Sequence, residues 1–385
     1  MKTLSRSPFP LSFFVLIAIL VAALTAACPL SCARAATAED PIDHLPKAQN
    51  SGYIVDTEKV AESVARIGQG DFGSIHSLVI LHEGRLVLET YFRGWSRDML
   101  HPMYSATKSV TSALIGIAIA QGRIKGVDQR VLGFFPEYTS IDNLDSNKQS
   151  LTLHHLLTMS AGFPWNEGSV PILNPDGTSN PLNSVHRMAC SGDWVKHVLD
   201  LPIVSTPGTA WVYNSGVSHV LSGILKNTTG LSAEAFAADN LFKPLGITTW
   251  QWTADPNGLS NTGGAKGGLF LRPVDMALFG CLYLRKGAFN GCRIIPAQWI
   301  VDSTARHMEG FAADYGYQWW VRSDLYLESA EPLSLFYAYG FGGQFIFVVP
   351  AMDMVVVTTG QNEQSNGREG LNLFLNSILP AVKKR

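Results

Sequence analysis

The chain has 385 residues, of which 46% are hydrophobic and only 16% are charged, and this composition excludes an intrinsically disordered protein. Lysine and arginine number 29 against 31 aspartates and glutamates, so the net charge of −2 excludes the strongly basic surface on which nucleic-acid binding depends. The length fits two or three average domains, or one large α/β unit with an inserted lobe.

The first 35 residues have the pattern of a secretory signal peptide. Lys2 and Arg6 precede an uncharged, mainly apolar run over residues 7–32, and Ala33 and Ala35 are the small residues before a cut after Ala35. We therefore expect residues 1–35 to be removed and the protein to be periplasmic or secreted. A single uncleaved membrane anchor is the main alternative, and a lipoprotein signal is a weaker one.

Residues 36–52 are polar and contain prolines, which is typical of an exposed lead-in, and we expect the folded domain to occupy residues 53–385. Two β-rich runs within 77–92 flank Glu83 and Gly84, which predicts a hairpin. Helical patterns separated by long Gly/Pro/Asn loops dominate residues 105–266 and predict a mostly helical lobe.

The C-terminal part returns to mixed elements. Helices are predicted over residues 273–287, 296–304 and 368–385, and strands over residues 315–322, 341–350 and 353–360. Strand patterns near both ends of the chain predict an α/β (α+β) fold, with one sheet built from both ends, flanking helices and the helical lobe inserted between them.

The cysteine pattern indicates no metal site. After cleavage the chain would keep Cys190, Cys281 and Cys292, an odd number without C-x-x-C or a Cys/His cluster at zinc spacing. An oxidising compartment would allow Cys281 to pair with Cys292, although the sequence does not select this pair. We expect no metal and no cofactor.

A nucleophile pattern stands at the start of the apolar stretch 103–122. Ser105 and Lys108 are three residues apart at an expected helix start, so both side chains share one helix face. A lysine whose proton affinity is lowered by burial and by the helix dipole can be the base for a serine hydroxyl. Free N–H groups there, including that of Ser105, can stabilise an oxyanion. The alternative is an N-cap serine with a solvated lysine.

A second polar turn precedes the predicted helix near residue 216. It contains Tyr213, Asn214 and Ser215. The phenol could relay a proton to a leaving group, while an amide could orient Lys108 and the substrate. The alternative is an ordinary helix cap beside a packed tyrosine.

A glycine-rich segment precedes the predicted strand at 341–350. Gly340, Gly342 and Gly343 would let a substrate approach the backbone closely, and an N–H near Gly343 or Gln344 could be the second oxyanion donor. Of the aromatic residues we expect Tyr339 and Phe341 to line the substrate pocket, because they adjoin this strand. The other aromatic candidates for a pocket wall are better explained as core, namely Trp165, Trp211, Trp250, Trp319, Trp320 and Tyr337.

Together these motifs resemble the serine β-lactamase and penicillin-binding-protein superfamily, in particular its class C-like β-lactamase-related serine hydrolases. That branch includes esterases, D-aminopeptidases and 6-aminohexanoate-dimer hydrolases. The resemblance runs from about Ser77 to the C-terminus and includes LTLHHLLTMSAGFPWNE, PGTAWVYNSG, NLFKPLGITTWQW and GGLFLRPVDMALFGCLYLRKG in the family's order. It implies a β-lactamase/transpeptidase-like fold, with Ser105 as the acylated nucleophile, Lys108 as base and Tyr213 as second general acid/base.

The sequence departs from the family at two motifs. The second motif is often Tyr-x-Asn, whereas Asn214 here directly follows Tyr213 and Ser215 takes the usual asparagine place, so either could face the substrate. The third motif in β-lactamases and D,D-peptidases is Lys-Thr-Gly or His-Thr-Gly, but residues 340–344 contain no cation. In the family that cation holds a substrate carboxylate, so its absence argues against β-lactams and peptide termini as substrates.

Other polar residues receive structural interpretations. His154 and His155 lie within a predicted helix, His219 lies further along the helix after Tyr213, and Asp275 follows Pro273 in a helix's first turn. We expect none of them in the catalytic set.

The sequence thus predicts an exported serine hydrolase that acts on a small-molecule ester or amide, as a carboxylesterase or a 6-aminohexanoate-oligomer type amidase. One alternative is a β-lactamase or D,D-peptidase, and another is a non-catalytic binding or sensor module. We expect no nucleic-acid partner and a membrane association only through an uncleaved N-terminus. The sequence indicates no oligomeric state.

Overall fold

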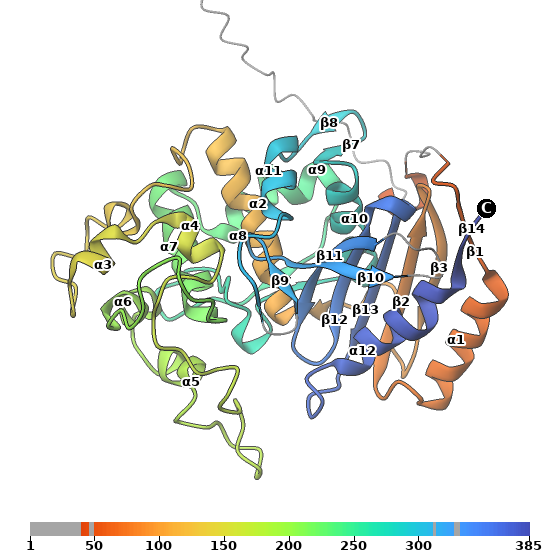
Figure 1. Ribbon diagram of the computed structural model, residues 1–385, viewed down its shortest axis with the longest axis horizontal. Helices are drawn as coiled ribbons and strands as arrows, with labels where there is room; N and C mark the ends of the chain where they lie inside the picture. The colour runs from red at the N-terminus through yellow and green to blue at the C-terminus, as the bar shows by residue number, and fades with distance from the viewer. Residues whose placement is uncertain (1–39, 46–49, 311–312, 327–331) are drawn as a thin grey trace, which may run out of the picture. The chain divides into compact units, whose positions relative to one another are not determined.

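Figure 1 shows the fold as a computed structural model, which describes residues 40–45, 50–310, 313–326 and 332–385. The predicted signal peptide, residues 1–35, lies outside the described residues. Within the described ranges, no helix combines the length and the apolar character that crossing a membrane requires.

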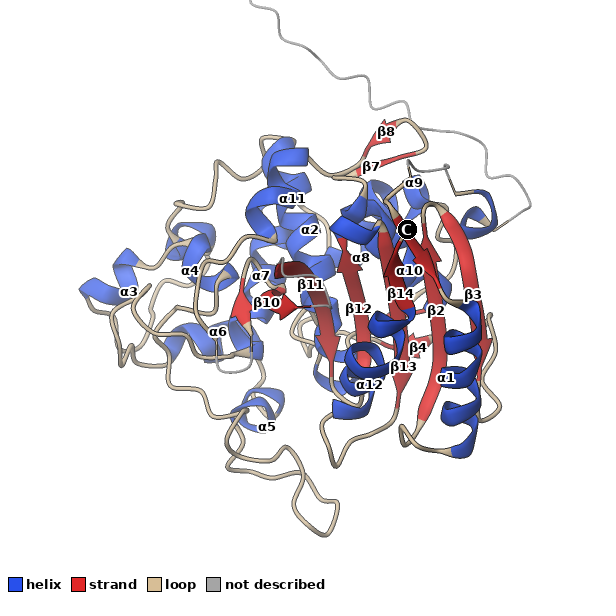
Figure 2. Ribbon diagram, turned by 45° about the vertical axis from the view of Figure 1, so that its right-hand side comes forward, coloured by secondary structure: helices blue, strands red, loops and turns tan. Residues whose placement is uncertain are grey.

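A seven-stranded antiparallel sheet is built from both ends of the chain, as predicted. Its order is β3-β2-β13-β12-β11-β10-β9, so β2 and β13 lie side by side although far apart in sequence (Figures 1 and 2). The strands are β2 (Ile75–His82), β3 (Arg85–Tyr91), β9 (Asp314–Tyr315), β10 (Trp320–Tyr326), β11 (Pro332–Gly340), β12 (Gln344–Val349) and β13 (Met354–Gly360). The β2–β3 hairpin turns at Glu83 and Gly84, whose φ angles of 49° and 67° are positive, as a tight two-residue hairpin turn requires.

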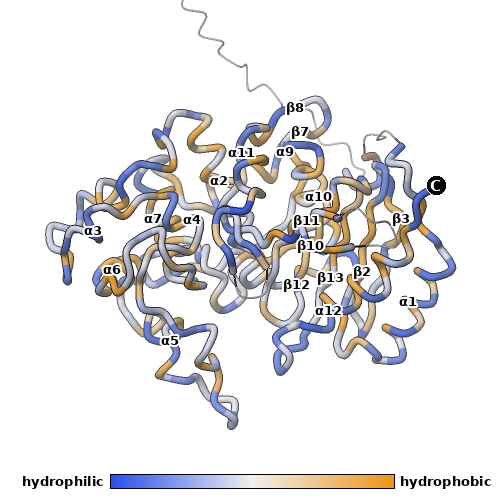
Figure 3. Tube along the Cα trace, viewed as in Figure 1, coloured by the Kyte–Doolittle hydropathy of each residue, from blue (hydrophilic) through white to orange (hydrophobic). Residues whose placement is uncertain are grey.

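Helices cover both faces of this sheet. Along β2, Val79 and Leu81 face one apolar cluster while Leu78 and Ile80 face another, because side chains alternate along a strand. Helix α10 (Pro273–Leu284) covers the first face, and α1 (Thr57–Gln69) and α12 (Arg368–Leu373) cover the second (Figure 2). The central strands are therefore apolar along most of their length, which Figure 3 shows in orange for β2, β12 and β13.

The predicted helical lobe follows β3 in the chain. Its first helix, α2 (Thr107–Ala120), is buried at almost every position, because its apolar residues surround the axis instead of forming one stripe. It contacts α7 and α8 of the lobe and also β11 of the sheet, so the start of α2 lies where lobe and sheet meet. The other helices here are α3 (Ser146–Ser150), α4 (Leu153–Leu157), α5 (Ser184–Ala189), α6 (Trp194–Asp200), α7 (Ser215–Thr229), α8 (Ala233–Ala237), α9 (Lys243–Leu245) and, beyond α10, α11 (Ala297–Ser303).

Short strands connect the lobe to the sheet. β4 (His101–Pro102), β6 (Leu269–Leu271) and β5 (Gln251–Trp252) pair in the order β4-β6-β5. The N–H of Met103 donates to the carbonyl of Leu269 at 2.8 Å, which holds the start of α2 beside β6. A separate hairpin joins β7 (Ala288–Phe289) to β8 (Cys292–Arg293).

The structure differs from the predictions at several elements. The expected helix over 368–385 is helical only to Ala381, as α12 (Arg368–Leu373) followed by a π-helical turn (Phe374–Ile378) and a 3-10 turn (Leu379–Ala381). The last residues instead form β14 (Val382–Lys384), which pairs with β1 (Tyr53–Val55). Pro380 has no N–H to continue an α-helix, which helps to explain why the helical segment ends at Ala381. Helix α1 and strand β11 were not predicted, and β12 begins at Gln344 because residues 341–343 form the turn between β11 and β12.

The suggested bond between Cys281 and Cys292 is wrong. Cys281 is a free, buried thiol inside α10, and burial raises its pKa to about 11. Cys292 is disulfide-bonded, but with neither Cys281 nor Cys190, which are both free. A position inside the core helix keeps Cys281 from pairing with the hairpin that carries Cys292.

Candidate active site

Ser105 lies in a single 3-10 turn, Tyr104–Ala106, that leads directly into α2. The residue before it, Tyr104, has a φ of 46°, a left-handed conformation that is costly for a bulky side chain. Such strain is maintained only where the surroundings enforce it, and it is concentrated at functional sites. The half-buried Ser105 is therefore presented on a sharp bend at the N-terminal end of a buried helix.

Two glycines allow other segments to approach this bend closely. A Cβ added to Gly264, whose φ is 85°, would lie 2.4 Å from the carbonyl oxygen of Tyr104 and 2.7 Å from the nitrogen of Ser105. A Cβ at Gly340, the last residue of β11, would lie 2.0 Å from the carbonyl oxygen of Met103. Only glycine fits either place, so both segments support the backbone around Ser105.

Lys108 is buried one helical turn after Ser105. Its Nζ lies 2.7 Å from Ser105 Oγ, 3.0 Å from Ser215 Oγ and 2.6 Å from the carbonyl oxygen of Gly263. Burial lowers the pKa of Lys108 to about 8, although the charge of Glu167 acts to raise it. A lysine with this pKa is partly neutral near pH 7 and can take a proton from Ser105.

Tyr213 approaches the same pair from the segment before α7. Lys108 Nζ lies 4.9 Å from the centre of the Tyr213 ring, and Ser105 is near enough to act on the pKa of the phenol, which it lowers. Trp320 stacks on the ring at 5.6 Å and Tyr315 packs edge-on at 6.3 Å. Burial raises the pKa of Tyr213 well above 10, so this phenol is protonated at neutral pH and can donate a proton to a leaving group.

The structure separates the roles of the two residues after Tyr213. Asn214 is the N-cap of α7, where its Oδ1 accepts from the N–H of Val217 at 3.0 Å. The next residue, Ser215, places its hydroxyl against Lys108. The geometry thus brings Ser215 to Lys108 and commits the Asn214 side chain to the helix start.

Glu167 is a site residue that sequence reasoning missed. It lies on the loop after α4, where its Oε2 accepts from the N–H of Ser215 at 2.8 Å and its Oε1 from Ser215 Oγ at 2.8 Å. Nothing in the local pattern distinguishes a glutamate in FPWNEG from an ordinary loop carboxylate. Gly263 was missed for a similar reason, because it contributes only a carbonyl oxygen.

The turn between β11 and β12 carries the remaining predicted residues. Gly342 and Gly343 have φ angles of 79° and 106°, and the N–H of Gly343 donates to the Gly340 carbonyl at 3.2 Å. The side-chain amide of Gln344 bonds the carbonyls of Phe341 and Gly360 at 3.0 Å and 2.7 Å, so this side chain stabilises the turn. Whether the backbone here completes an oxyanion hole stays a prediction.

Of the two aromatic residues expected in the pocket wall, Phe341 lies in this turn and Tyr339 lies near the end of β11. Phe341 packs edge-on against Tyr104, the residue before Ser105, at 5.7 Å. Tyr339 stacks on Phe345 at 4.8 Å and donates its hydroxyl to the carbonyl of Asn366. Neither Tyr339 nor Phe341 lines the nearby cavity of about 150 Å³, whose lining is Tyr104, Gly342, His76, Trp95, His101, Pro102, Gly360, Gln361 and Glu363.

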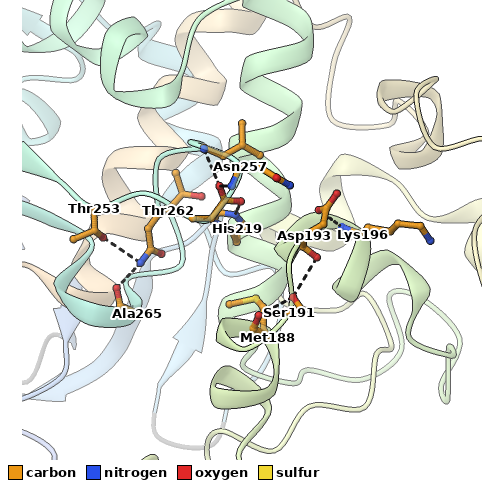
Figure 4. A network of polar contacts seen from close by, with 12 residues as sticks. Met188, Ser191, Asp193, Lys196, His219, Thr253, Asn257, Thr262 and Ala265 are labelled. Atoms are coloured by element: carbon orange, nitrogen blue, oxygen red, sulfur yellow. Dashed lines mark hydrogen bonds and ion pairs between the residues drawn. The ribbon is translucent and has the colours of Figure 1, made fainter.

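The other polar candidates lie in structural networks. His219 Nε2 pairs with Asp255 Oδ2 at 2.9 Å deep in the lobe, beside the loop that carries Thr253 and Asn257 (Figure 4). His155 completes a capping box at the start of α4, and Asp275 is bonded by Arg272 at 2.7 Å. Among the described residues, no three His, Cys, Asp or Glu side chains gather where they could hold a metal ion.

Comparisons with known proteins identify the family of the chain. The Beta-lactamase family profile matches residues 70–375. The chain is 24% identical over 295 residues to the 6-aminohexanoate-dimer hydrolase of Paenarthrobacter ureafaciens, an alignment that covers 73% of this chain and 71% of that protein.

Solved structures show the same fold. A Bacillus anthracis protein provisionally named a 6-aminohexanoate-dimer hydrolase superposes with a TM-score of 0.65 at 21% identity, over 89% of this chain and 88% of that one. A family VIII carboxylesterase has a TM-score of 0.64 at 17% identity, over 87% and 99%. The β-lactamase/D-alanine carboxypeptidase of Yersinia pestis superposes with a TM-score of 0.63 at 18% identity, over 84% of this chain and 98% of that one. This chain therefore belongs to the Beta-lactamase family and is a hydrolase with the β-lactamase/transpeptidase-like fold.

Proposed function

We propose that this protein is an exported serine hydrolase that cleaves an ester or amide of a small molecule through an acyl-enzyme on Ser105. The observation that carries the proposal is the contact of 2.7 Å between the Ser105 hydroxyl and a buried Lys108 whose pKa is lowered to about 8. A serine hydroxyl needs a nearby base to act as a nucleophile. A lysine with a purely structural role would have no need of an accessible serine among its hydrogen-bond partners, whereas Lys108 has Ser105.

In the proposed acylation step, Ser105 Oγ bonds to the substrate carbonyl carbon while its proton passes to Lys108 Nζ. The carbonyl electron pair moves to oxygen, where the N–H of Ser105 at the helix start is one donor. When the intermediate collapses, the bond to the leaving group breaks and Tyr213 supplies the proton that this group needs. Tyr213 regains a proton from Lys108, and water then releases the acyl group by the reverse sequence.

The esterase or amidase reading is favoured by the third motif. Residues 340–344 contain no cation where β-lactamases and D,D-peptidases have one, and Phe341 in this segment packs against Tyr104. Relatives named as 6-aminohexanoate-dimer hydrolase and carboxylesterase support the same reading. Export is proposed from the N-terminal 35 residues alone.

One observation favours a second candidate, a D,D-peptidase or β-lactamase. Arg368, at the start of α12, lies close enough to Tyr339 for its charge to oppose the burial that raises the pKa of that phenol. A cation near this edge of the site could hold a substrate carboxylate from another direction than the family's third motif.

Intact-protein mass spectrometry separates these candidates. Wild type and Ser105→Ala are each exposed to a short-chain p-nitrophenyl ester and, separately, to benzylpenicillin. An acyl adduct or a burst of p-nitrophenol that appears in wild type but not in Ser105→Ala, and that forms with the ester but not with benzylpenicillin, supports the esterase or amidase. A stable penicilloyl adduct would favour the cell-wall candidate, and no adduct and no turnover with either would favour the non-catalytic module.

A further inference from the structure

The hydrogen bonds of Lys108 contain an ambiguity that the fold must resolve. As an ammonium group, Lys108 has three N–H donors for its three neighbours, Ser105 Oγ, Ser215 Oγ and the carbonyl oxygen of Gly263. The active base is the neutral amine, which has two N–H donors and one lone pair. One of the three contacts must then change direction, and only a lone pair aimed at Ser105 is productive.

Gly263 removes one choice. Its carbonyl oxygen can only accept, so at 2.6 Å from Lys108 Nζ it always takes an N–H. The lone pair is left with two candidates, the hydroxyl of Ser105 and the hydroxyl of Ser215. Both are hydroxyls able to donate, and their distances of 2.7 Å and 3.0 Å from Nζ are similar.

Glu167 removes the other choice. Its Oε1 lies 2.8 Å from Ser215 Oγ, and a carboxylate only accepts, so the single proton of the Ser215 hydroxyl points at Glu167. Ser215 Oγ must then accept the second N–H of Lys108, and the lone pair is left for Ser105. We propose that Glu167 is a positioning residue that acts through Ser215 to aim the lone pair of Lys108 at the nucleophile.

Further hydrogen bonds hold the Glu167 carboxylate in this position. Glu167 Oε2 accepts from the N–H of Ser215 at 2.8 Å and also from Trp165 Nε1. The adjacent Asn166 fastens the loop, since its Oδ1 accepts from the N–H of Ser184 at 2.8 Å. A surface glutamate that merely solvates a loop would not meet both the N–H and the hydroxyl of one buried serine.

The charge of Glu167 gives the proposal a second signature. The titratable groups that face Lys108 are Glu167 and Tyr213, with Tyr315 and Tyr339 around Tyr213. Burial raises the pKa of these tyrosines, so they stay protonated while Lys108 titrates. A negative charge near an ammonium favours its protonated form, so removing the charge of Glu167 must lower the pKa of Lys108.

The test, which rests on the proposed acyl-enzyme function, compares Glu167→Ala and Glu167→Gln by their pH profiles of kcat/KM with a p-nitrophenyl ester. Glutamine keeps an oxygen that can accept from Ser215, whereas alanine leaves the hydroxyl free to donate to Lys108. We expect Glu167→Ala to lose about 10- to 100-fold in kcat/KM and Glu167→Gln to recover part of that loss. In Glu167→Gln the acidic limb of the profile should move to lower pH.

Two controls separate positioning from a damaged loop. Asp176→Asn removes an exposed carboxylate from the same long loop, and it should change neither the rate nor the limb. In a Ser215→Ala background, Glu167→Ala should lower kcat/KM by less than about threefold, because the hydroxyl through which Glu167 acts is gone. An equal loss in both backgrounds, or an acidic limb that does not move in Glu167→Gln, would overturn the proposal.

A readout without turnover keeps this test separate from the proposed function. The Lys108 side chain, labelled with carbon-13, can be titrated by NMR in wild type and in Glu167→Gln. A lower pKa in the variant supports the proposal even if no substrate is found, whereas identical titrations would contradict it. A wild type that turns over no ester or amide would refute the proposed function alone.

Discussion

The pH dependence of ester hydrolysis, measured with and without Lys108, examines the assigned base directly. Burial is the main cause that lowers the pKa of Lys108 from its ordinary value of 10.5 to about 8. At pH 7, a lysine with a pKa of about 10.5 is neutral in roughly 0.03% of molecules, whereas one with a pKa of about 8 is neutral in roughly 10%. Burial therefore raises the amount of active base roughly 300-fold.

The assay is the initial rate of p-nitrophenyl ester hydrolysis over about pH 6 to 9.5, expressed as kcat/KM. Because the neutral amine is the active form, kcat/KM should fall about tenfold per pH unit below the pKa near 8 and level off above it. In Lys108→Ala, kcat/KM on the high-pH plateau should fall about 10²–10⁴-fold, and the decrease of kcat/KM below about pH 8 should disappear. A wild-type rate independent of pH, or a limb that persists in Lys108→Ala, would refute the reasoning.

Three more substitutions probe the site, and a fourth is a control for one of them. Tyr213→Phe should lose about 10²–10⁴-fold in kcat without loss of thermal stability, and near-normal turnover would remove Tyr213 from the mechanism. Gly264→Ala should lower both activity and the free energy of unfolding, the latter by more than about 1 kcal/mol, because the new Cβ meets the backbone at Ser105. Gly291→Ala, at φ 80° with nothing near the added Cβ, isolates the strain alone, and an equal effect there would contradict the steric argument. Asn214→Ala should cost about 0.5–2 kcal/mol in urea unfolding with little change in KM, whereas a large KM effect at unchanged stability would assign Asn214 to the substrate.

Local patterns predicted those elements that local chemistry determines. The apolar stretch after Ser105 predicted α2, the residues Glu83 and Gly84 predicted the β2–β3 hairpin, and Pro273 marked the start of α10. The antiparallel sheet built from both chain ends followed from where the strand patterns lie, and the order of strands confirms it.

The parts that sequence reasoning missed depend on distant partners. β14 is three residues long and exists because it pairs with β1 across the whole chain. Glu167 acquires its place only when its loop meets Ser215, and Gly263 contributes a backbone oxygen that no side-chain pattern can reveal. Periodicity and motif spacing describe neighbours along the chain, so contacts of this range need the folded structure.

The central claim, that Ser105 is the nucleophile activated by Lys108, can be tested without knowing the substrate. An alkyl fluorophosphonate is incubated with wild type, Ser105→Ala and Lys108→Ala, and the modified peptide is located by mass spectrometry. The account predicts phosphonylation of wild type at Ser105, none in Ser105→Ala, and labelling slowed by at least about 100-fold in Lys108→Ala. Modification of a different serine, or equal labelling rates in wild type and Lys108→Ala, would contradict it.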